Sequence, residues 1–269
     1  MRISDAVGTF AIVFVLPEDI NITDGAPKYH RNFMDIYLSQ FDRGYLSDLM
    51  EYQKAIKQRN ALLKELKDRR RTAANVPELE AWDDILLRPA LRIMAARQKL
   101  TDEIMANITR LTANLSGPSD QITISYRPKL AMKDFHDFGE AIELFRKERA
   151  RDLVHTYTVA GPHRDSFEIS IGGTSLKKYG SMGQRKTVLI AMKLAALLVL
   201  SEHRGEQAIL VLDEAFAELD PDRANWLLGL LSGFGQVFLA SANIGGLNIP
   251  GKMKIFDVAQ GKVMERSNQ

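Results

Sequence analysis

The 269-residue sequence predicts an α/β fold, a mostly parallel sheet flanked by helices with a long antiparallel helical arm inserted. Two patterns support this prediction. Beyond residue 120, continuous apolar runs such as 208–212 alternate with helical segments, as expected for parallel strands buried on both faces. From about residue 44 to 115, the apolar side chains instead keep helical spacing. We divide the chain into an edge segment of the main domain, the helical arm and a C-terminal lobe, over residues 1–43, 44–117 and 118–269.

The composition limits the chemistry that the chain can perform. There is no cysteine, so disulfides and thiolate metal sites are excluded, which fits a reducing cytoplasm. The net charge of +2 does not by itself indicate a nucleic-acid partner. The longest apolar stretches, such as residues 10–16, are shorter than the ~20 residues of a membrane span. We therefore expect a cytoplasmic protein with no membrane partner.

The first segment begins with a β-like run, "TFAIVFVLPEDI" (9–20), which we interpret as a buried strand. A signal-peptide core is the alternative for its apolar residues, but no small-residue cleavage site follows them. "DGAPKYHR" (24–31) then predicts a turn that leads into a helix.

The arm is predicted from two helical runs. In the first, apolar spacings of three, four or seven connect Tyr45, Leu49, Tyr52, Ile56, Leu63 and Leu66, and only Arg59-Asn60 fills the gap. The second extends from Leu79 to Leu115. Pro89 is expected to kink or split it, and "LSGPSD" (115–120) to end it.

The turn between the two runs is basic. Residues 42–71 carry nine Lys or Arg against five Asp or Glu, and both a solvated helix face and a DNA-contacting face are compatible with this excess. For the DNA-contacting alternative we select the residues near the arm tip, Lys64, Lys67, Arg69, Arg70 and Arg71.

The C-terminal lobe alternates strands and helices. We expect strands at 121–126, 167–173, 207–215 and 235–243, and helices at 137–154 and 184–203. The last helix is so apolar that burial on more than one side is expected.

One stretch, "KKYGSMGQRKTVL" (177–189), is compatible with two nucleotide-handling loops. A P-loop needs a buried strand leading into it and a glycine before its lysine, so that backbone N–H groups surround a phosphate. Arg185 precedes Lys186 here, and "SLKKYG" is not a buried strand. The stretch instead fits the signature loop with which an ABC-type ATPase contacts its partner's nucleotide. Ser181 would cap the following helix, whose N-terminus presents partial positive charge to a phosphate.

The segment that follows has the order this interpretation requires. The apolar strand ends at Asp213, where a Walker B carboxylate would hold Mg²⁺, and Glu214 is placed to polarise the attacking water. "ELDPDR" (218–223) matches a D-loop with Asp220 at its tip. Each feature alone has an ordinary structural explanation, as an acidic strand end or a helix cap. Their order within 40 residues favours an ABC-type ATPase head.

With these residues the chain resembles the RecF family, bacterial DNA-repair ATPases related to SMC-type proteins. The resemblance covers nearly all 269 residues, and "GPHRD" (161–165) together with "SMGQR" (181–185) is specific to that family. It implies a partial ABC-type head with an inserted, lid-like arm, and an ATP-dependent homodimer. It implies binding of DNA at single-strand gaps and junctions, with recombination mediator proteins that load recombinase in repair, replication and the SOS response.

The resemblance also implies roles for individual residues. Ser181, Gly183, Gln184 and Asp220 would contact ATP or the dimer seam, and Asp213 and Glu214 would serve Mg²⁺ and hydrolysis. Arg164 is expected to make a polar contact and His163 a structural one. Two features depart from the family pattern. The strand ends in Asp-Glu rather than two aspartates, and "LASAN" (239–243) stands where a phosphate-sensing histidine is common, leaving Ser241 or Asn243 as candidates.

No stretch of the 269 residues is a P-loop, or Walker A, which in a complete head precedes the region where this sequence starts. We expect negligible ATP binding by the chain alone, and a fragment, a mis-started reading frame and a split protein stay open as explanations. Two other functions are compatible with the residues: a nucleotide-binding subunit of an ABC transporter, and a non-catalytic DNA- or protein-binding module. The length of the arm argues against the transporter.

Overall fold

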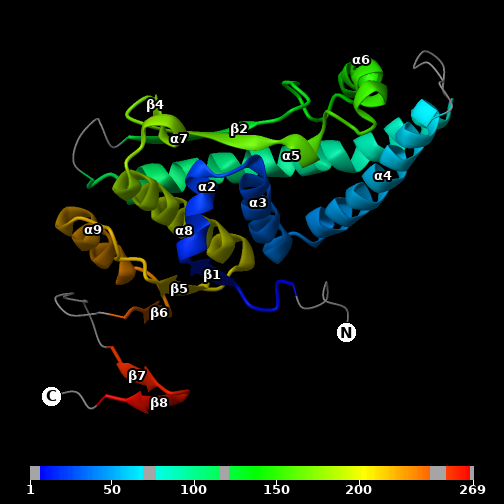
Figure 1. Cartoon of the computed structure of the whole chain (residues 1–269). Helices are drawn as coiled ribbons and strands as arrows, with labels where there is room; N and C mark the ends of the chain where they lie inside the picture. Colours follow the sequence, from blue (N-terminus) through cyan, green and yellow to red (C-terminus); the bar gives the residue numbers. More distant parts are fainter. Residues whose placement is uncertain (1–6, 69–76, 116–120, 243–252, 267–269) are drawn as a thin grey trace.

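The predicted parallel sheet is present in the computed structural model, which describes residues 7–68, 77–115, 121–242 and 253–266 (Figure 1). Its strands follow the order β1-β5-β6, and both neighbouring pairs are parallel. The strands are β1 (Ile12–Val15), β5 (Ile209–Asp213) and β6 (Val237–Ala240). The carboxyl ends of β5 and β6 therefore lie at one edge of the sheet, where the sequence places its acids.

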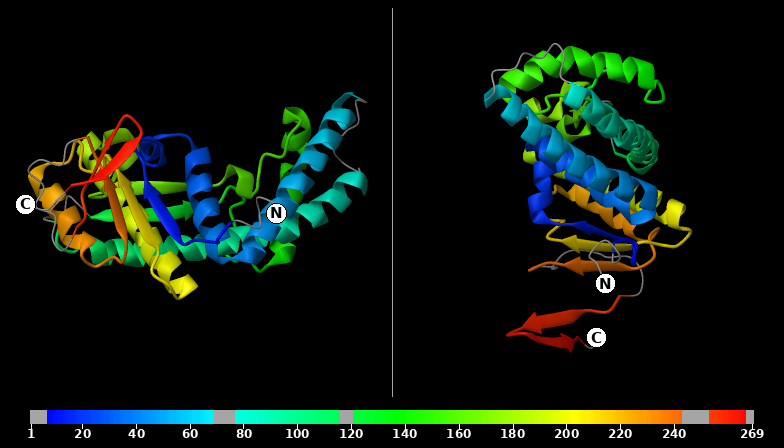
Figure 2. Two further views of the ribbon diagram at one scale, coloured as in Figure 1. Left: turned by 90° about the horizontal axis from the view of Figure 1, so that it is seen from below. Right: turned by 90° about the vertical axis from the view of Figure 1, so that its right-hand side faces the viewer.

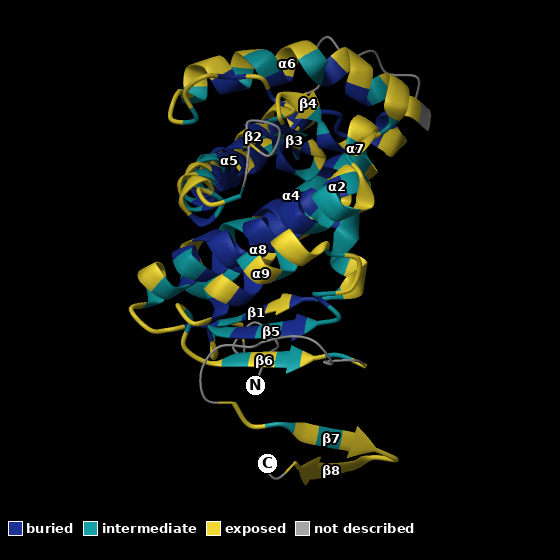
Figure 3. Cartoon of the chain, turned by 90° about the vertical axis from the view of Figure 1, so that its left-hand side faces the viewer, coloured by how far each residue is buried: buried dark blue, intermediate teal, exposed yellow. Residues whose placement is uncertain are grey.

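The two faces of this sheet differ in burial (Figure 3). Val13 and Leu210 point toward the core and are almost fully buried. Phe14 and Phe238 both flank Val211 in the register, and they are 43% and 51% exposed. The expectation that these strands are covered on both faces is therefore wrong for the described residues.

Helix α8 (Met182–Arg204) lies at the centre of the fold. Its side chains from Thr187 to Leu200 are buried, apart from the partly exposed Leu198. It packs against α2 (Asn21–Asp24), α3 (Pro27–Phe41), β1 and the long helix α5. The expected burial on more than one side is confirmed, and it explains why the helix has almost no polar face.

The arm consists of α4 (Arg43–Asp68) and α5 (Pro77–Leu111), which pack against each other (Figure 1). α5 also packs against β2, α6 and α8, so it crosses the molecule as one element. Pro89 lies inside this single helix, so of our two expectations, a kink or a split, the split is wrong. Pro89 is buried between Leu86 and Leu91, and packing on several sides offsets the one hydrogen bond that a helical proline removes.

A second sheet is antiparallel, with the order β2-β3-β4. Strands β2 (Ile122–Arg127) and β3 (Ser166–Ile171) alternate buried and accessible residues, as expected when one face packs on the core and the other meets solvent. The sequence predicts both strands, but it does not predict that they form a sheet separate from the parallel one.

The other described elements connect or flank these layers. They are η1 (Pro17–Ile20), α6 (Phe138–His155), η3 (Pro162–Arg164), β4 (Thr174–Ser175), α7 (Leu176–Tyr179), α9 (Pro221–Leu231), β7 (Phe256–Ala259) and β8 (Lys262–Glu265). The β7–β8 hairpin stands apart from the parallel sheet (Figure 2). Within the described ranges, no helix is long and apolar enough to cross a membrane.

Candidate functional site

The turn before α8 is an exposed helix cap. The Ser181 hydroxyl accepts from the Gln184 amide at 3.2 Å, and the Gln184 side chain accepts from the Ser181 amide at 3.0 Å. This reciprocal capping box explains the Ser-x-x-Gln spacing. Ser181 and Met182 are exposed, and the Ser181 hydroxyl keeps its own proton for donation. The exposed N-terminus of a buried helix suits an anion, so the residues present fit a phosphate group.

Glu214 follows β5 in a left-handed conformation, with φ of 48°. Its amide donates to Ala240 and continues the β5–β6 ladder by one residue. Its carboxylate accepts from the Ala242 amide at 2.6 Å and from the Ser241 hydroxyl at 3.3 Å. Three polar groups thus fix both the backbone and the side chain of the proposed catalytic acid. Asp213, one residue earlier, is half-buried.

The cap and the acid are neighbours in space. Lys186, in the first turns of α8, places its ammonium 2.9 Å from the Glu214 carbonyl oxygen. A Cβ on Gly183 would lie 3.2 Å from an Arg223 nitrogen and 3.8 Å from the Glu218 carbonyl oxygen. A turn buried far from the acids would have excluded the signature interpretation. The structure instead brings turn and acids together on one side.

Asp220 is the N-cap of α9, which begins at Pro221. One carboxylate oxygen accepts from the Arg223 amide at 2.9 Å, and the other lies 2.7 Å from the Arg223 guanidinium. Pro221 occupies the first helical position, where a missing N–H costs nothing. Because Arg223 also lies against Gly183, Asp220 is held close to the cap of α8.

The lysine and threonine that suggest a P-loop have other roles. Lys186 binds the Glu214 carbonyl, and burial lowers its pKa while Glu218 and Glu214 oppose that shift. The Thr187 hydroxyl is buried and donates to the Gly183 carbonyl within α8. Both side chains therefore bind carbonyl groups of this chain.

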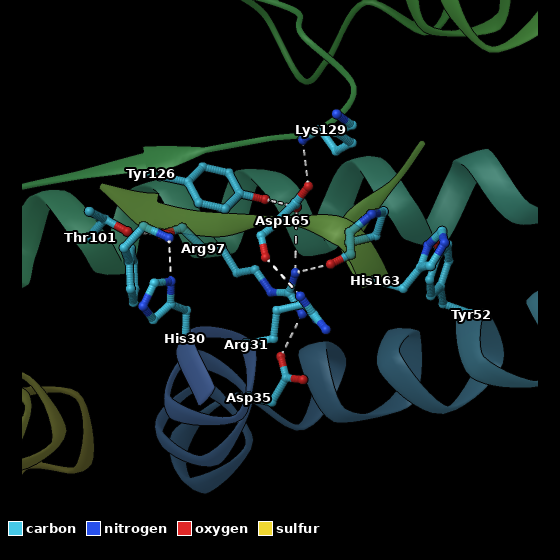
Figure 4. A network of polar contacts seen from close by, with 12 residues as sticks. His30, Arg31, Asp35, Tyr52, Arg97, Thr101, Tyr126, Lys129, His163 and Asp165 are labelled. Atoms are coloured by element: carbon cyan, nitrogen blue, oxygen red, sulfur yellow. Dashed lines mark hydrogen bonds and ion pairs between the residues drawn. The ribbon is translucent and has the colours of Figure 1, made fainter. Parts of the chain in front are cut away.

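The "GPHRD" segment belongs to a buried polar network beneath the arm (Figure 4). The Nε2 atom of His163 lies 2.9 Å from the Thr158 carbonyl oxygen, which only accepts, so Nε2 carries the proton. Nδ1 then accepts from the Tyr52 hydroxyl at 2.6 Å. Burial lowers the pKa of His163 to about 4, so it is neutral near pH 7. Gly161 has φ of 127°, and a Cβ there would lie 2.7 Å from the Tyr52 oxygen.

Asp165 is the anionic centre of this network. It accepts from the Tyr126 hydroxyl and from the Lys129 amide, the latter at 2.7 Å. Arg97 reaches it at 3.5 Å and also binds Asp35 at 2.8 Å. Burial raises the pKa of Asp165, and the Arg97 charge opposes that shift. Arg164, by contrast, is exposed and stacks on Tyr157, 4.6 Å from the ring centre.

A second buried network lies between the arm and α6, and our sequence interpretation missed it. Arg59 binds Asp83 at 2.8 Å and Asp152 at 2.7 Å, and Arg149 lies 2.7 Å from Asp83. The sequence contains a signal for it. Arg59 falls between Ile56 and Leu63 at spacings of three and four, on the apolar stripe that it was taken to interrupt.

The proposed DNA contacts are only partly described. Lys64 and Lys67 are exposed on α4, and the Lys67 ammonium lies 3.4 Å from the Val154 carbonyl oxygen. Arg69, Arg70 and Arg71 lie outside the described residues, as does Asn243.

Because the capped turn and the acid-tipped strand share one edge of a parallel sheet, and long helices are inserted between β1 and β5, the fold is that of an ABC-type ATPase head with a helical insertion. Two solved structures share it, described as the recombination mediator protein RecF with ATPrS and with ATP in the RecFOR pathway. Both are 28% identical to this chain. The ATPrS structure superposes with a TM-score of 0.81, over 98% of this chain and 70% of its own. The ATP structure superposes with a TM-score of 0.80, over 97% of this chain and 69% of its own.

Three curated relatives carry the description "DNA replication and repair protein RecF". The protein from Exiguobacterium sp. is 32% identical over 99% of this chain and 72% of its own length. The Bacillus subtilis protein is 32% identical over 92% of this chain and 67% of its own length. The Agathobacter rectalis protein is 35% identical over 86% of this chain and 61% of its own length. No family model matches the sequence. The chain belongs to the RecF family, and the family supports a repair protein over a transporter subunit. It spans 61 to 72% of these relatives' lengths.

Proposed function

We propose that this chain forms the signature, Walker B and D-loop part of an ATP-dependent, dimerising DNA-repair ATPase of the RecF type. The main support for this proposal is the contact between Lys186 and Glu214. It holds the exposed cap of α8 and the acidic end of β5 on one side of the molecule. The RecF structures with ATP and ATPrS support ATP as the nucleotide.

The residues at this edge have distinct proposed roles. The hydroxyl of Ser181 and the N-terminal amides of α8, including Gly183, would bind the phosphate of ATP held by a second copy, with Gln184 fixing the turn. Asp213 would hold Mg²⁺, which supplies charge neutralisation for the phosphates when bound. Glu214, fixed by Ala242 and Ser241, would orient the attacking water.

The partners follow from the family and from the surface of the arm. The proposed DNA is a gapped duplex or a single-strand/double-strand junction, and the exposed Lys64 and Lys67 would contact its phosphates. We further propose that residues 44–117 act as a lid-like insertion, that recombination mediators bind the dimer, and that it acts in the cytoplasm.

The test replaces Glu214 with Gln in the chain together with a P-loop segment supplied from a RecF relative. Loss of the carboxylate should slow hydrolysis, so dimers should accumulate with ATP and Mg²⁺ and be seen by size-exclusion chromatography with light scattering. Glu143→Gln, which makes the same change at an exposed glutamate on α6, is the control and should leave turnover unchanged. Equal dimer fractions with and without ATP for Glu214→Gln would contradict the proposal.

DNA binding needs its own measurement. Filter binding to gapped and to intact duplex should favour the gapped form, and affinity should fall with salt as phosphate contacts predict. Lys64→Gln should reduce the salt slope by about one unit if it neutralises one phosphate. Equal affinity for both duplexes would argue against action at gaps.

A further inference from the structure

The contact between Lys186 and Glu214 joins two functional elements of one chain. Under the proposed function, the cap of α8 serves a nucleotide held by a second copy, whereas Glu214 serves the nucleotide on its own side. Lys186 is the side chain that connects them, with its ammonium 2.9 Å from the Glu214 carbonyl oxygen.

The backbone at Glu214 needs such a partner. A non-glycine residue with positive φ is uncommon, and Glu214 has φ of 48°. The same carbonyl oxygen accepts from the Ala217 amide at 3.3 Å, so it closes the turn after β5. The Lys186 ammonium is a charged donor to this carbonyl, and it stabilises the backbone conformation in which the Glu214 carboxylate reaches the Ala242 amide.

The cap is held from its other side as well. Arg185 binds Asp24 at 2.8 Å and the Lys177 carbonyl at 3.0 Å, and Lys177 binds the Gly25 carbonyl at 3.0 Å. This set attaches the cap to α2 and α7, away from the acids. On the side of the acids, Lys186 connects the first turns of α8 to Glu214, so a displacement of these turns would also displace the Glu214 carbonyl.

We propose that Lys186 is a positioning residue that couples the signature turn to Glu214, so that contact with a nucleotide at one site of the dimer sets the orientation of the acid at the other. The coupling rests on the proposed function, but the contact itself is testable without nucleotide.

The first test uses the 269-residue chain alone and hydrogen exchange of backbone amides. Lys186→Met should speed exchange about fivefold to tenfold at Ala217 and Ala242, the two amides bound by Glu214. Lys186→Arg should restore the slow rates, because it keeps the charge and reach. Lys178→Met removes an exposed lysine from α7 and should change neither amide.

Unchanged exchange at Ala217 and Ala242 in a folded Lys186→Met variant would overturn the proposal. If that variant does not fold, Lys186→Gln removes the charge alone and is judged by the same two amides. A Glu214→Gly background provides a thermodynamic check, because glycine adopts positive φ without a partner. The loss in folding equilibrium constant caused by Lys186→Met should be severalfold smaller there than in the parent chain.

The second test adds nucleotide, with the P-loop segment of a RecF relative, ATPγS and Mg²⁺. In the parent chain, exchange should slow at residues 181–186 and also at Ala217 and Ala242. In Lys186→Met, only 181–186 should slow. Equal slowing at Ala217 and Ala242 in both proteins would overturn the coupling. No slowing at 181–186 in either protein would instead contradict the proposed nucleotide contact.

Discussion

The Nε atom of Arg59 lies 2.8 Å from a carboxylate oxygen of Asp83, and neither side chain has any solvent exposure. The two residues belong to α4 and α5, and the same guanidinium reaches Asp152 on α6 at 2.7 Å. Three helices of the arm region therefore meet at one buried cation. Burying a charge is favourable only while it keeps its partners, so removal of one partner should be costly.

Asp83→Ala should destabilise the chain by about 3–5 kcal/mol, because it leaves the buried Arg59 and Arg149 short of an anion. Urea unfolding followed by circular dichroism would measure the loss. The matched control is Asp48→Ala, which breaks an ion pair with Arg92 whose side chain is 56% exposed, and which should cost less than about 1 kcal/mol. Similar losses in both variants would show that the buried network does not organise the arm.

The folding stability should depend on the protonation of His163. Its pKa is about 4 in the fold and 6.5 ordinarily, so between these values the unfolded chain binds more protons. This contribution is complete well above pH 6.5 and is lost as pH falls toward 4, by about 3 kcal/mol. Gln in place of His163 cannot titrate but offers a donor and an acceptor. The difference between the urea midpoints at pH 7 and at pH 4.5 should be smaller in His163→Gln than in the parent chain. Both proteins keep His30, so its titration contributes equally to each. An identical difference in both proteins would contradict the assignment.

Two substitutions at Ser181 separate its capping role from its proposed nucleotide contact. Ser181→Ala loses the acceptor for the Gln184 amide and should cost about 1 kcal/mol of stability. Ser181→Asp keeps a cap acceptor and should retain the parent's thermal midpoint, yet it places negative charge where a phosphate would bind. With the P-loop segment supplied, neither variant should form ATP-dependent dimers in light scattering. Dimers of Ser181→Asp at the parent's level would argue against the phosphate contact.

The isolated 269-residue chain should bind ATP negligibly, since Lys186 and Thr187, which suggest a P-loop, bind the Glu214 and Gly183 carbonyls instead. Isothermal titration calorimetry with ATP and Mg²⁺ should give no saturable heat. Addition of the P-loop segment should restore binding. Micromolar affinity of the chain alone would show that other residues surround the phosphates.

Much of the parallel sheet and of the site was predictable, because both depend on local sequence. A short apolar run that includes Val211 and Leu212 and is followed by two acids is typical of a buried strand. Ser181 with Gln184 three residues later forms a cap through contacts within one turn. The signature pattern also gives the order of cap, acid and D-loop. The contact of Lys186 with a carbonyl 28 residues away has no local signal.

The errors share a physical cause in tertiary packing. Pro89 stays inside α5 because neighbouring elements bury it, and a rule about isolated helices does not include them. Arg59 was taken as a gap in the apolar stripe, whereas Asp83 and Asp152 make its burial favourable from distant positions. The exposed face of the parallel sheet, with Phe14 and Phe238, likewise could not be predicted from strands whose composition is apolar on both faces.

The continuity of α5 makes its length as important as its composition. The helix contacts α4 and α6 toward one end and α8 and β2 toward the other. One residue inserted between these regions would rotate one end against the other by about 100° and lengthen the helix by about 1.5 Å. Side chains such as Leu79 and Ile108 could then no longer face their partners together. Insertions and deletions within α5 should therefore be poorly tolerated, because its packing at both ends requires a fixed residue count.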